Sequence, residues 1–296
     1  MLISSFTKHK NFLWTLFFTG IVTLFSSFLP NLVQNGIALI GILTVGILHG
    51  ANDLKILNAL PGKKKYPTTT LFVSYIGVVI LGIGLFSFLP LLGLISFVGV
   101  SCYHFGEQHW QGKLKPKGNP FPLYIFYGGV IFFLLFTFQY NTTTDVIQQM
   151  TQIYLPFSFF WMGLALLFLL FFLTVFRYTD SFIPIFEEMA LLAVFAILFA
   201  NSTLVFGFAY YFVVWHSLPS LKEQVHYLYQ QTAFVSYYQY FKTAAMYWVL
   251  AIMGLCSSYF FFEFSESQYL TLLFSFLAAI TFPHVVVMGW MFNSKK

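Results

Sequence analysis

Four histidines each lie near the end of a long apolar run of this chain. His49 lies in "GILHGANDL", His104 in "SCYHFGEQHW", His216 in "VVWHSLPS" and His284 in "TFPHVVVMGW". An ionisable ring among apolar neighbours is costly, and within membrane segments such residues usually mark function. Imidazole binds Zn, Cu, Fe and Ni, so these four rings would together suit a divalent transition metal.

Two of these histidines have a carboxylate close behind them in the sequence. Asp53 follows His49 by four residues and Glu107 follows His104 by three, spacings that place both groups on one face of a helix. A metal-bound imidazole commonly donates its other N–H to a carboxylate, which fixes the orientation of the ring. We therefore expect Asp53 and Glu107 to orient the histidines that precede them.

The composition of the chain decides where such a site would lie. Of its 296 residues, 59% are hydrophobic and only 8% are charged, whereas a soluble domain has about 25% charged residues. A surface this poor in charge must face lipid. The apolar runs are about 18–25 residues long, which suits helices and not barrel strands. We predict one integral membrane domain over residues 1–296, whose net charge of +5 reflects its orientation and not nucleic-acid binding.

Ten apolar segments are expected to form the helices of an all-α, polytopic transmembrane bundle. They cover about 11–29, 36–60, 70–89, 90–110, 121–139, 157–177, 182–200, 201–218, 241–262 and 268–292. Polar stretches connect them. The stretch from 218 to 234, "LPSLKEQVHYLYQQTAF", is long enough for a helix along the membrane surface.

The basic residues predict the orientation of this bundle. On one side of a ten-helix arrangement fall Lys8, Lys10, Lys63, Lys64, Lys65, Lys113, Lys115, Lys117, Arg177, Lys222, Lys242, Lys295 and Lys296. The opposite loops carry the acidic residues Asp145, Glu263 and Glu266. Because cytoplasmic loops are enriched in Lys and Arg, we expect the N- and C-termini to be cytoplasmic.

In this arrangement, the four helices that end in a histidine all run from the outside inward. The four rings then lie at one depth and can converge inside the bundle. Glu187 and Glu188 fall at a comparable depth and are further candidates for contacts around the metal. His109, five residues after His104, turns away from that face and is expected at the interface. His226 belongs to the surface segment.

Other interpretations of the four histidines compete with a metal site. Such rings can instead form hydrogen bonds between helices, and two pairs could ligate a haem. A transporter with a His/Glu proton relay is a different functional class. A desaturase would need clustered H-x-x-H-H boxes, which the sequence lacks.

Four motifs, taken in order, resemble the Brp/Blh family of membrane-embedded β-carotene 15,15′-dioxygenases. They are "HGAND" at 49–53, "YHFGEQ" at 103–108, "YFVVWHS" at 211–217 and "FPH" at 282–284. The resemblance implies Fe(2+) bound by histidines, and cleavage of the central double bond of β-carotene by O2 into two molecules of all-trans-retinal. It also implies a multi-pass protein of the cell inner membrane that supplies retinal to a rhodopsin. His49, His104 and His216 fall on the histidine positions of the family.

One position departs from the family pattern, which has a second histidine four residues after the "WHS" histidine. Here that position is Ser220, directly after Pro219. Three alternatives follow: His284 completes the ligand set, the site has three histidines, or the chain has lost the activity. A carrier that binds carotenoid or retinal without catalysis also stays open.

Overall fold

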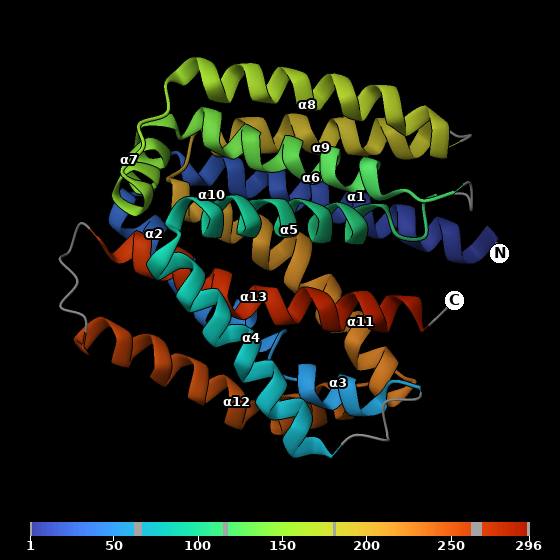
Figure 1. The fold of residues 1–296 in the computed structure, drawn as a ribbon. Coiled ribbons are helices and arrows are strands. Elements are labelled where there is room, and N and C mark those ends of the chain that lie inside the picture. The colour runs from blue at the N-terminus through green and yellow to red at the C-terminus, as the bar shows by residue number, and fades with distance from the viewer. Residues whose placement is uncertain (1, 62–66, 115–117, 180–181, 262–267, 295–296) are drawn as a thin grey trace.

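The computed structural model describes residues 2–61, 67–114, 118–179, 182–261 and 268–294, and these residues form helices without a strand. The predicted all-α class is therefore confirmed. Figure 1 shows how the α-helices are arranged, and the π-helical segments η1 and η3 are continuous with neighbouring helices. The helical segments are α1 (Leu2–Ser26), α2 (Asn31–Gly41), η1 (Ile42–Gly46), α3 (Asp53–Ala59), α4 (Thr68–Phe88), α5 (Pro90–Trp110), α6 (Phe121–Phe138), α7 (Tyr140–Thr151), α8 (Phe157–Tyr178), α9 (Phe182–Ala200), α10 (Leu204–Tyr210), η3 (Tyr211–Ser217), α11 (Leu218–Tyr229), α12 (Phe234–Phe261) and α13 (Tyr269–Asn293).

Within the described residues, seven helices are long and apolar enough to cross a membrane, which makes this a multi-pass membrane protein. They are α4, α6, α8, α9, the continuous helix Leu204–Tyr229, α12 and α13. Phe12–Ser26 and Asn31–Gly46 are shorter apolar helices. Helix α5 is not among the seven, because the polar residues of its last two turns lower its hydropathy. A total of ten crossings stays a prediction.

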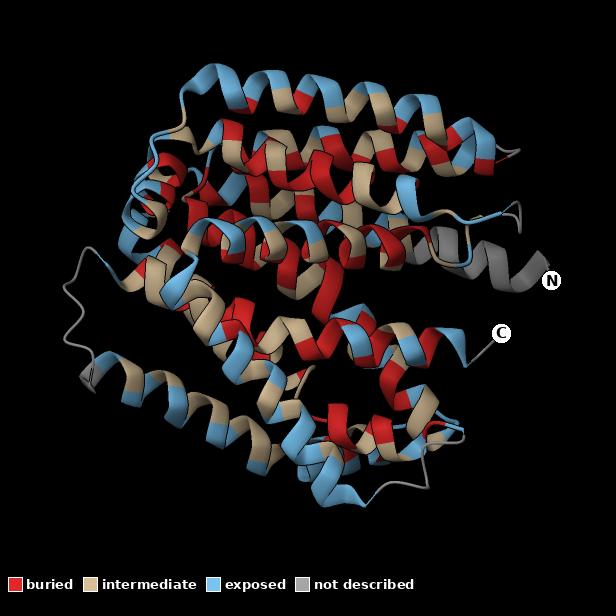
Figure 2. Ribbon diagram, viewed as in Figure 1, coloured by how far each residue is buried: buried red, intermediate tan, exposed pale blue. Residues whose placement is uncertain are grey.

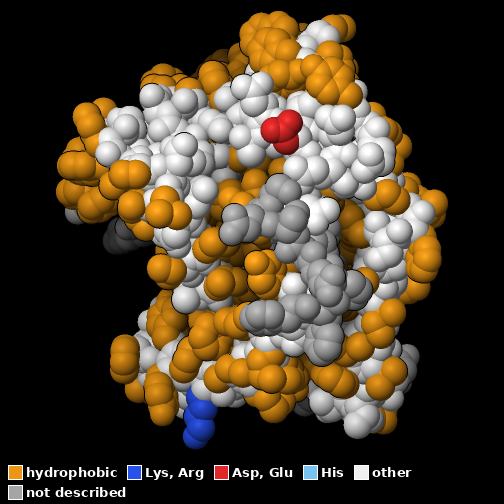
Figure 3. All heavy atoms as spheres, turned by 90° about the vertical axis from the view of Figure 1, so that its left-hand side faces the viewer, with side chains coloured by type: hydrophobic (Ala, Val, Ile, Leu, Met, Phe, Trp, Pro, Cys, Tyr) orange, Lys and Arg blue, Asp and Glu red, His pale blue; other side chains and the backbone are white. Residues whose placement is uncertain are grey.

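The outer faces of the bundle are apolar, as a lipid-facing surface requires. Figure 2 shows exposed residues along α8, α4 and α12, and buried residues concentrated between the layers. Exposed side chains include Trp161 and Phe172 on α8 and Ile80 and Leu81 on α4. The end face that carries α7 has hydrophobic side chains around most of its rim and very few charged ones (Figure 3).

Glycines bring α5 and α6 into backbone contact. A Cβ atom on Gly106 would lie 1.9 Å from the carbonyl oxygen of Tyr124, and one on Gly128 would lie 1.9 Å from that of Cys102. Only residues without a side chain permit this approach, which is a common device where membrane helices cross. This contact fixes the position of α5, the helix that carries His104, against α6.

Three segments differ from the sequence-based expectation. The run 36–60 is not one helix: α2 and η1 are followed by turns at residues 49–52, after which α3 begins. The run 201–218 becomes π-helical at Tyr211 and continues into α11. Pro219 lies in the first turn of α11 and has no N–H to donate to the preceding turn. The stretch expected as a polar connection after α6 forms α7.

Figure 1 places the two chain ends at the same end of the bundle and α7, with Asp145, at the opposite end. This arrangement agrees with an even number of crossings, but the side that is cytoplasmic stays a prediction. Some of the charged residues on which the predicted orientation depends lie outside the described residues. These are Lys63, Lys64, Lys65, Lys115, Lys117, Glu263, Glu266, Lys295 and Lys296, together with the side chains of Lys8 and Lys10.

Candidate metal centre

The structure brings the four histidines into one cluster inside the bundle. His104 comes from α5 and His216 from η3; His284 comes from α13, and His49 from the turn after η1. Ring centroids lie 5.2 Å apart for His49 and His216, and 4.7 Å for His49 and His284. The centroid of His104 lies 4.8 Å from that of His216 and 5.4 Å from that of His284. Each ring therefore has two others as neighbours, and all four are buried.

Three of the histidines are already close to the geometry of a metal site. One donor atom from each of His49, His216 and His284 lies within 4.8 Å of the others. Such a group can hold a metal ion with small side-chain adjustments. His104 is adjacent to this set through its ring contacts with His216 and His284.

The hydrogen bonds of the cluster leave ring nitrogens without a partner. The Nδ1 of His49 bonds to the carbonyl oxygen of Gly46, and the Nδ1 of His284 to Asp53. Among the described residues, the Nε2 atoms of His49 and His284, both ring nitrogens of His104 and the Nδ1 of His216 have no hydrogen-bond partner. Buried polar atoms are rarely left unpaired. Several unpaired imidazole nitrogens at one point fit a metal ion, which accepts their lone pairs.

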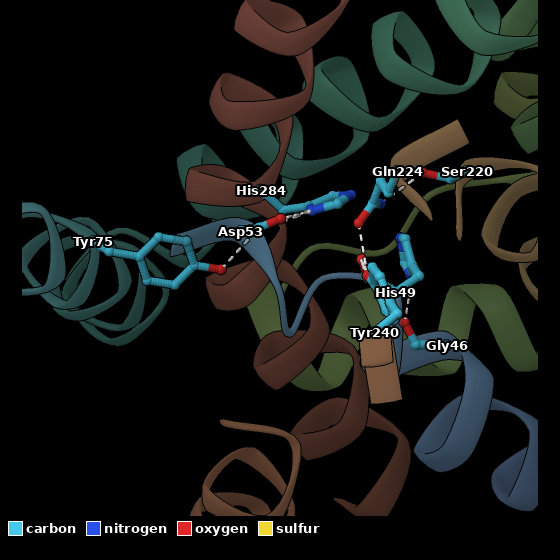
Figure 4. Close-up of polar contacts among 8 residues, drawn as sticks. All are labelled: Gly46, His49, Asp53, Tyr75, Ser220, Gln224, Tyr240 and His284. Atoms are coloured by element: carbon cyan, nitrogen blue, oxygen red, sulfur yellow. Dashed lines mark hydrogen bonds and ion pairs between the residues drawn. The ribbon is translucent and has the colours of Figure 1, made fainter. Parts of the chain in front are cut away.

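Asp53 orients a different histidine from the one expected. Its carboxylate oxygens both lie 3.0 Å from the Nδ1 of His284 on α13, and its Oδ2 accepts a hydrogen bond of 3.0 Å from Tyr75 on α4 (Figure 4). The expectation that Asp53 supports His49 assumed a continuous helix. Turns at residues 49–52 break that helix and send Asp53 toward α13.

The carbonyl of Gly46 takes the place of a carboxylate behind His49. Gly46 ends η1, and a Cβ there would lie 2.8 Å from the ring of Phe212 in η3. The two π-helical segments therefore pack against each other at this glycine. π-helical turns often occur at functional sites, and here η1 ends three residues before His49 while η3 contains His216.

The remaining candidate carboxylates lie as follows. Glu107 accepts a hydrogen bond of 2.9 Å from Tyr103, one turn earlier on α5. Glu188 is fully buried and pairs with Lys113 and Tyr127. Glu187 is partly buried on α9. A role for these three carboxylates at the four rings stays a prediction.

Ser220 belongs to a buried hydrogen-bond network that reaches the backbone carbonyl of His49. Its hydroxyl accepts a hydrogen bond of 3.0 Å from Gln224. The hydroxyl of Tyr240 lies 2.7 Å from the Oε1 of Gln224 and 2.9 Å from the carbonyl oxygen of His49 (Figure 4), and it can donate to one of them at a time. The position of the missing family histidine thus supports the backbone at His49 through Gln224 and Tyr240.

Sequence reasoning missed several of these contacts. Gln108 donates a hydrogen bond of 2.9 Å to the carbonyl oxygen of His216, and its position one turn after His104 was an available signal. His109 was expected at the interface but is buried, beside Glu188. Tyr75 and Tyr240 lie on other helices than the histidines they support, so spacing could not identify them.

A large apolar cavity opens onto the histidines. Its volume is about 700 Å³, within the range of ligand pockets. All four histidines line it, together with residues of α4, α12 and α13. Along α4 its lining extends from Phe72 to Ser87, which is about 22 Å of helix at 1.5 Å per residue. The cavity thus runs from the cluster toward the end of the bundle that carries α7 and can hold an elongated apolar molecule.

Comparison with known proteins identifies the family. Searches of curated proteins and of solved structures gave no match. A family model described as Beta-carotene 15,15'-dioxygenase matches residues 40–292, a range that includes all four histidines and the helices that line the cavity. The chain therefore belongs to the β-carotene 15,15′-dioxygenase family.

Proposed function

We propose that this protein cleaves the central double bond of β-carotene with O2, in an Fe(2+)-dependent reaction that gives two molecules of all-trans-retinal. One C=C bond breaks and two C=O bonds form, so one O2 molecule supplies both carbonyl oxygens. The observation that carries the proposal is the cluster of buried, unpaired imidazole nitrogens at one end of a long apolar cavity. A metal in polar surroundings without such a cavity would have no place for a polyene.

In this proposal, His49, His104, His216 and His284 bind the iron. Bound iron would supply the activation of O2 that the reaction requires. Asp53 and the carbonyl of Gly46 each accept the Nδ1–H of one ring and so keep Nε2 free for the metal. These hydrogen bonds assign the ring proton of His49 and of His284 to Nδ1.

The cavity positions and shields the substrate. Phe105 and Phe212 lie against the ring of His216, with centroids 4.5 Å and 5.6 Å from it, and both line the cavity. These apolar walls exclude water from the reacting double bond. The lining along α4, α12 and α13 binds one arm of the polyene. Because the substrate dissolves in lipid, we also propose that the protein acts in the inner membrane, where its product is available to a retinal-binding rhodopsin.

Expression in a β-carotene-producing bacterium tests this function. The cells are expected to lose their orange colour only when O2 is present, and extraction should give retinal as the product. His216→Ala should keep the cells orange, whereas His226→Ala, which alters an exposed histidine of α11, should not. Orange cells with well-expressed protein, or apocarotenals of unequal length, would contradict central cleavage.

Two measurements separate the alternative functions. Iron that co-purifies with the protein favours the enzyme or a metal-dependent binder over a transporter with a proton relay. Retinal formation separates the enzyme from a carrier that binds carotenoid without cleaving it.

A further inference from the structure

A second buried polar cluster lies beside η3. The carboxylate of Glu188 on α9 is fully buried, accepts a hydrogen bond from Tyr127 on α6, and forms an ion pair with Lys113, just after α5. The Nδ1 of His109 on α5 lies 3.5 Å from the same carboxylate. Three helices thus converge on one buried acid, which none of the steps above uses.

The ring of His109 connects this cluster to η3. It stacks against Tyr211, with centroids 5.8 Å apart and an interplanar angle of 8°. It also stacks against Trp215, at 6.2 Å and 14°. Both aromatic residues belong to η3, and Trp215 directly precedes His216.

The adjacent face of η3 carries the candidate metal ligand His216. Phe212 and His216 stack on each other at 5.6 Å, and both rings contact His49. The π-helical segment therefore has two faces: Tyr211 and Trp215 meet His109, while Phe212 and His216 meet the histidine cluster. A change in the helical register of η3 would therefore rotate all four of these side chains together.

Helix α5 also holds the backbone of η3. Gln108 donates its hydrogen bond to the carbonyl oxygen of His216, and the next residue, His109, makes the ring contacts described above. Two consecutive side chains of α5 therefore fix η3, one through its backbone and one through its aromatic face.

A π-helical segment needs such support, because π-helices are rare and seldom longer than one turn. If η3 relaxed to an α-helix by shifting one residue, the following residues would rotate by about 100°, since an α-helix has 3.6 residues per turn. The imidazole of His216 would then leave the neighbourhood of His49 and His104. The π-helical register of η3 therefore keeps the His216 ring beside His49 and His104.

We propose that Glu188 and His109 are positioning residues that lock the π-helical register of η3 and so aim His216 at the other three histidines. The carboxylate holds the His109 ring, and that ring presses on Tyr211 and Trp215. This inference rests on the proposed function, in which His216 binds the metal. Glu188 acts through His109 and needs no contact with the metal or the substrate.

Binding of Co²⁺ to the purified full-length protein tests the lock, because the visible spectrum of bound Co²⁺ reports its ligands. Glu188→Gln and His109→Ala are each expected to weaken Co²⁺ binding by about 10–100-fold, the usual cost of losing a group that orients a ligand. At a fixed Co²⁺ concentration, the visible absorption of bound Co²⁺ in both variants should fall toward that of His216→Ala, which lacks this ligand. His109→Phe keeps a flat ring against Tyr211 and should restore part of the affinity.

Gln139→Leu provides a matched control for general destabilisation. Gln139 donates hydrogen bonds of 2.6 Å to the carbonyl oxygens of Phe199 and Ser202, and so joins α6 to the end of α9 away from η3. This variant should lower thermal stability but keep the wild-type Co²⁺ spectrum and affinity. If Gln139→Leu loses as much affinity as Glu188→Gln, the effect is not specific to η3 and the lock is refuted.

The behaviour of His216→Ala separates the two proposals. If it loses Co²⁺ while Glu188→Gln and His109→Ala bind it like the wild type, the lock is wrong and the metal site stands. If His216→Ala itself keeps wild-type Co²⁺ binding, then His216 is not a ligand, and the proposed site fails first.

Discussion

The Nδ1 nitrogen of His284 lies 3.0 Å from each carboxylate oxygen of Asp53, although 231 positions separate the two residues in the sequence. Asp53 begins α3, His284 lies on α13, and the hydroxyl of Tyr75 on α4 donates to the same carboxylate. One buried acid thus connects three helices and orients the imidazole that it touches. His284 is thereby prepared as a ligand in the way that carboxylates orient metal-binding histidines.

Asp53→Asn should therefore weaken metal binding by about 10–100-fold without abolishing it. An amide is neutral and holds the His284 ring less firmly than a carboxylate does. Titration of the purified protein with Fe²⁺ under anaerobic conditions gives the affinity. Asp145→Asn, on α7 at the opposite end of the bundle, serves as the control. An unchanged affinity in Asp53→Asn would show that the contact only joins helices.

Alanine substitutions at His49, His104, His216 and His284 are expected to abolish bound iron, because each removes one metal–nitrogen bond. Metal analysis of each purified variant, with His226→Ala as control, measures the effect. His104→Ala is the most informative of the four, since the other three already place donor atoms within 4.8 Å of one another. Iron retained at wild-type level in His104→Ala alone would reduce the site to three histidines. Retention in all four would make the cluster structural.

The sequence allowed the class of fold and the convergence of the histidines to be predicted, for identifiable physical reasons. Low charge and long apolar runs require lipid-facing helices. Because an ionisable ring is costly to expose to lipid, imidazoles at one depth are expected to face the interior of the bundle. The partners of those rings could not be predicted in the same way. The pairing of Asp53 with His284 depends on turns at residues 49–52, and "HGAND" itself does not reveal that a helix breaks there.

The π-helical segments and α7 could not be predicted from the sequence, for a related reason. The apolar run through Tyr211 and His216 is compatible with an α-helix and with a π-helix, and the contacts of η3 with His109 and Gln108 come from another helix that the run itself does not reveal. In α7, polar residues outnumber apolar ones. Thr143, Thr144 and Ile147 nevertheless lie buried at helical spacing, a pattern that the composition of the segment concealed.

Ser220→His tests whether the departure from the family pattern matters. The new ring would lie one turn after His216, but Ser220 is buried against Gln224 and connects through it to Tyr240 and His49. We therefore expect the variant to gain no metal affinity and to leave His284 essential. Iron binding by Ser220→His, with and without His284→Ala, measures this. Tolerance of His284→Ala in the Ser220→His background would instead show that position 220 can face the metal.

Reporter fusions test the orientation of the bundle. Fusions after Pro61, Lys117 and Lys296 should all report the cytoplasm, and a fusion near Asp145 should report the outside, because basic residues accumulate in cytoplasmic loops. Each fusion needs its expression level as a control. If the Lys117 and Asp145 fusions report the same side, the expected count of ten crossings is wrong.

Filling the cavity should separate substrate binding from metal binding. Gly254 lines the cavity on α12, and a Cβ built on it meets no atom within 4 Å. Gly254→Leu therefore adds a side chain to empty space without a clash, and its bulk occupies the volume in which the polyene would lie. We expect normal iron content but at least about tenfold slower retinal formation, because pocket shape controls binding of an apolar ligand.

The matched control is Gly84→Leu. Gly84 is a glycine of α4 that also has no atom within 4 Å of its built Cβ, and it is not among the residues that line the cavity. Both variants add the same side chain to a membrane helix, so a loss confined to Gly254→Leu locates the substrate in the cavity. Wild-type retinal formation by Gly254→Leu would show that the polyene reaches the histidines by another route. Equal losses in both variants would mean that a leucine on either helix disturbs the fold.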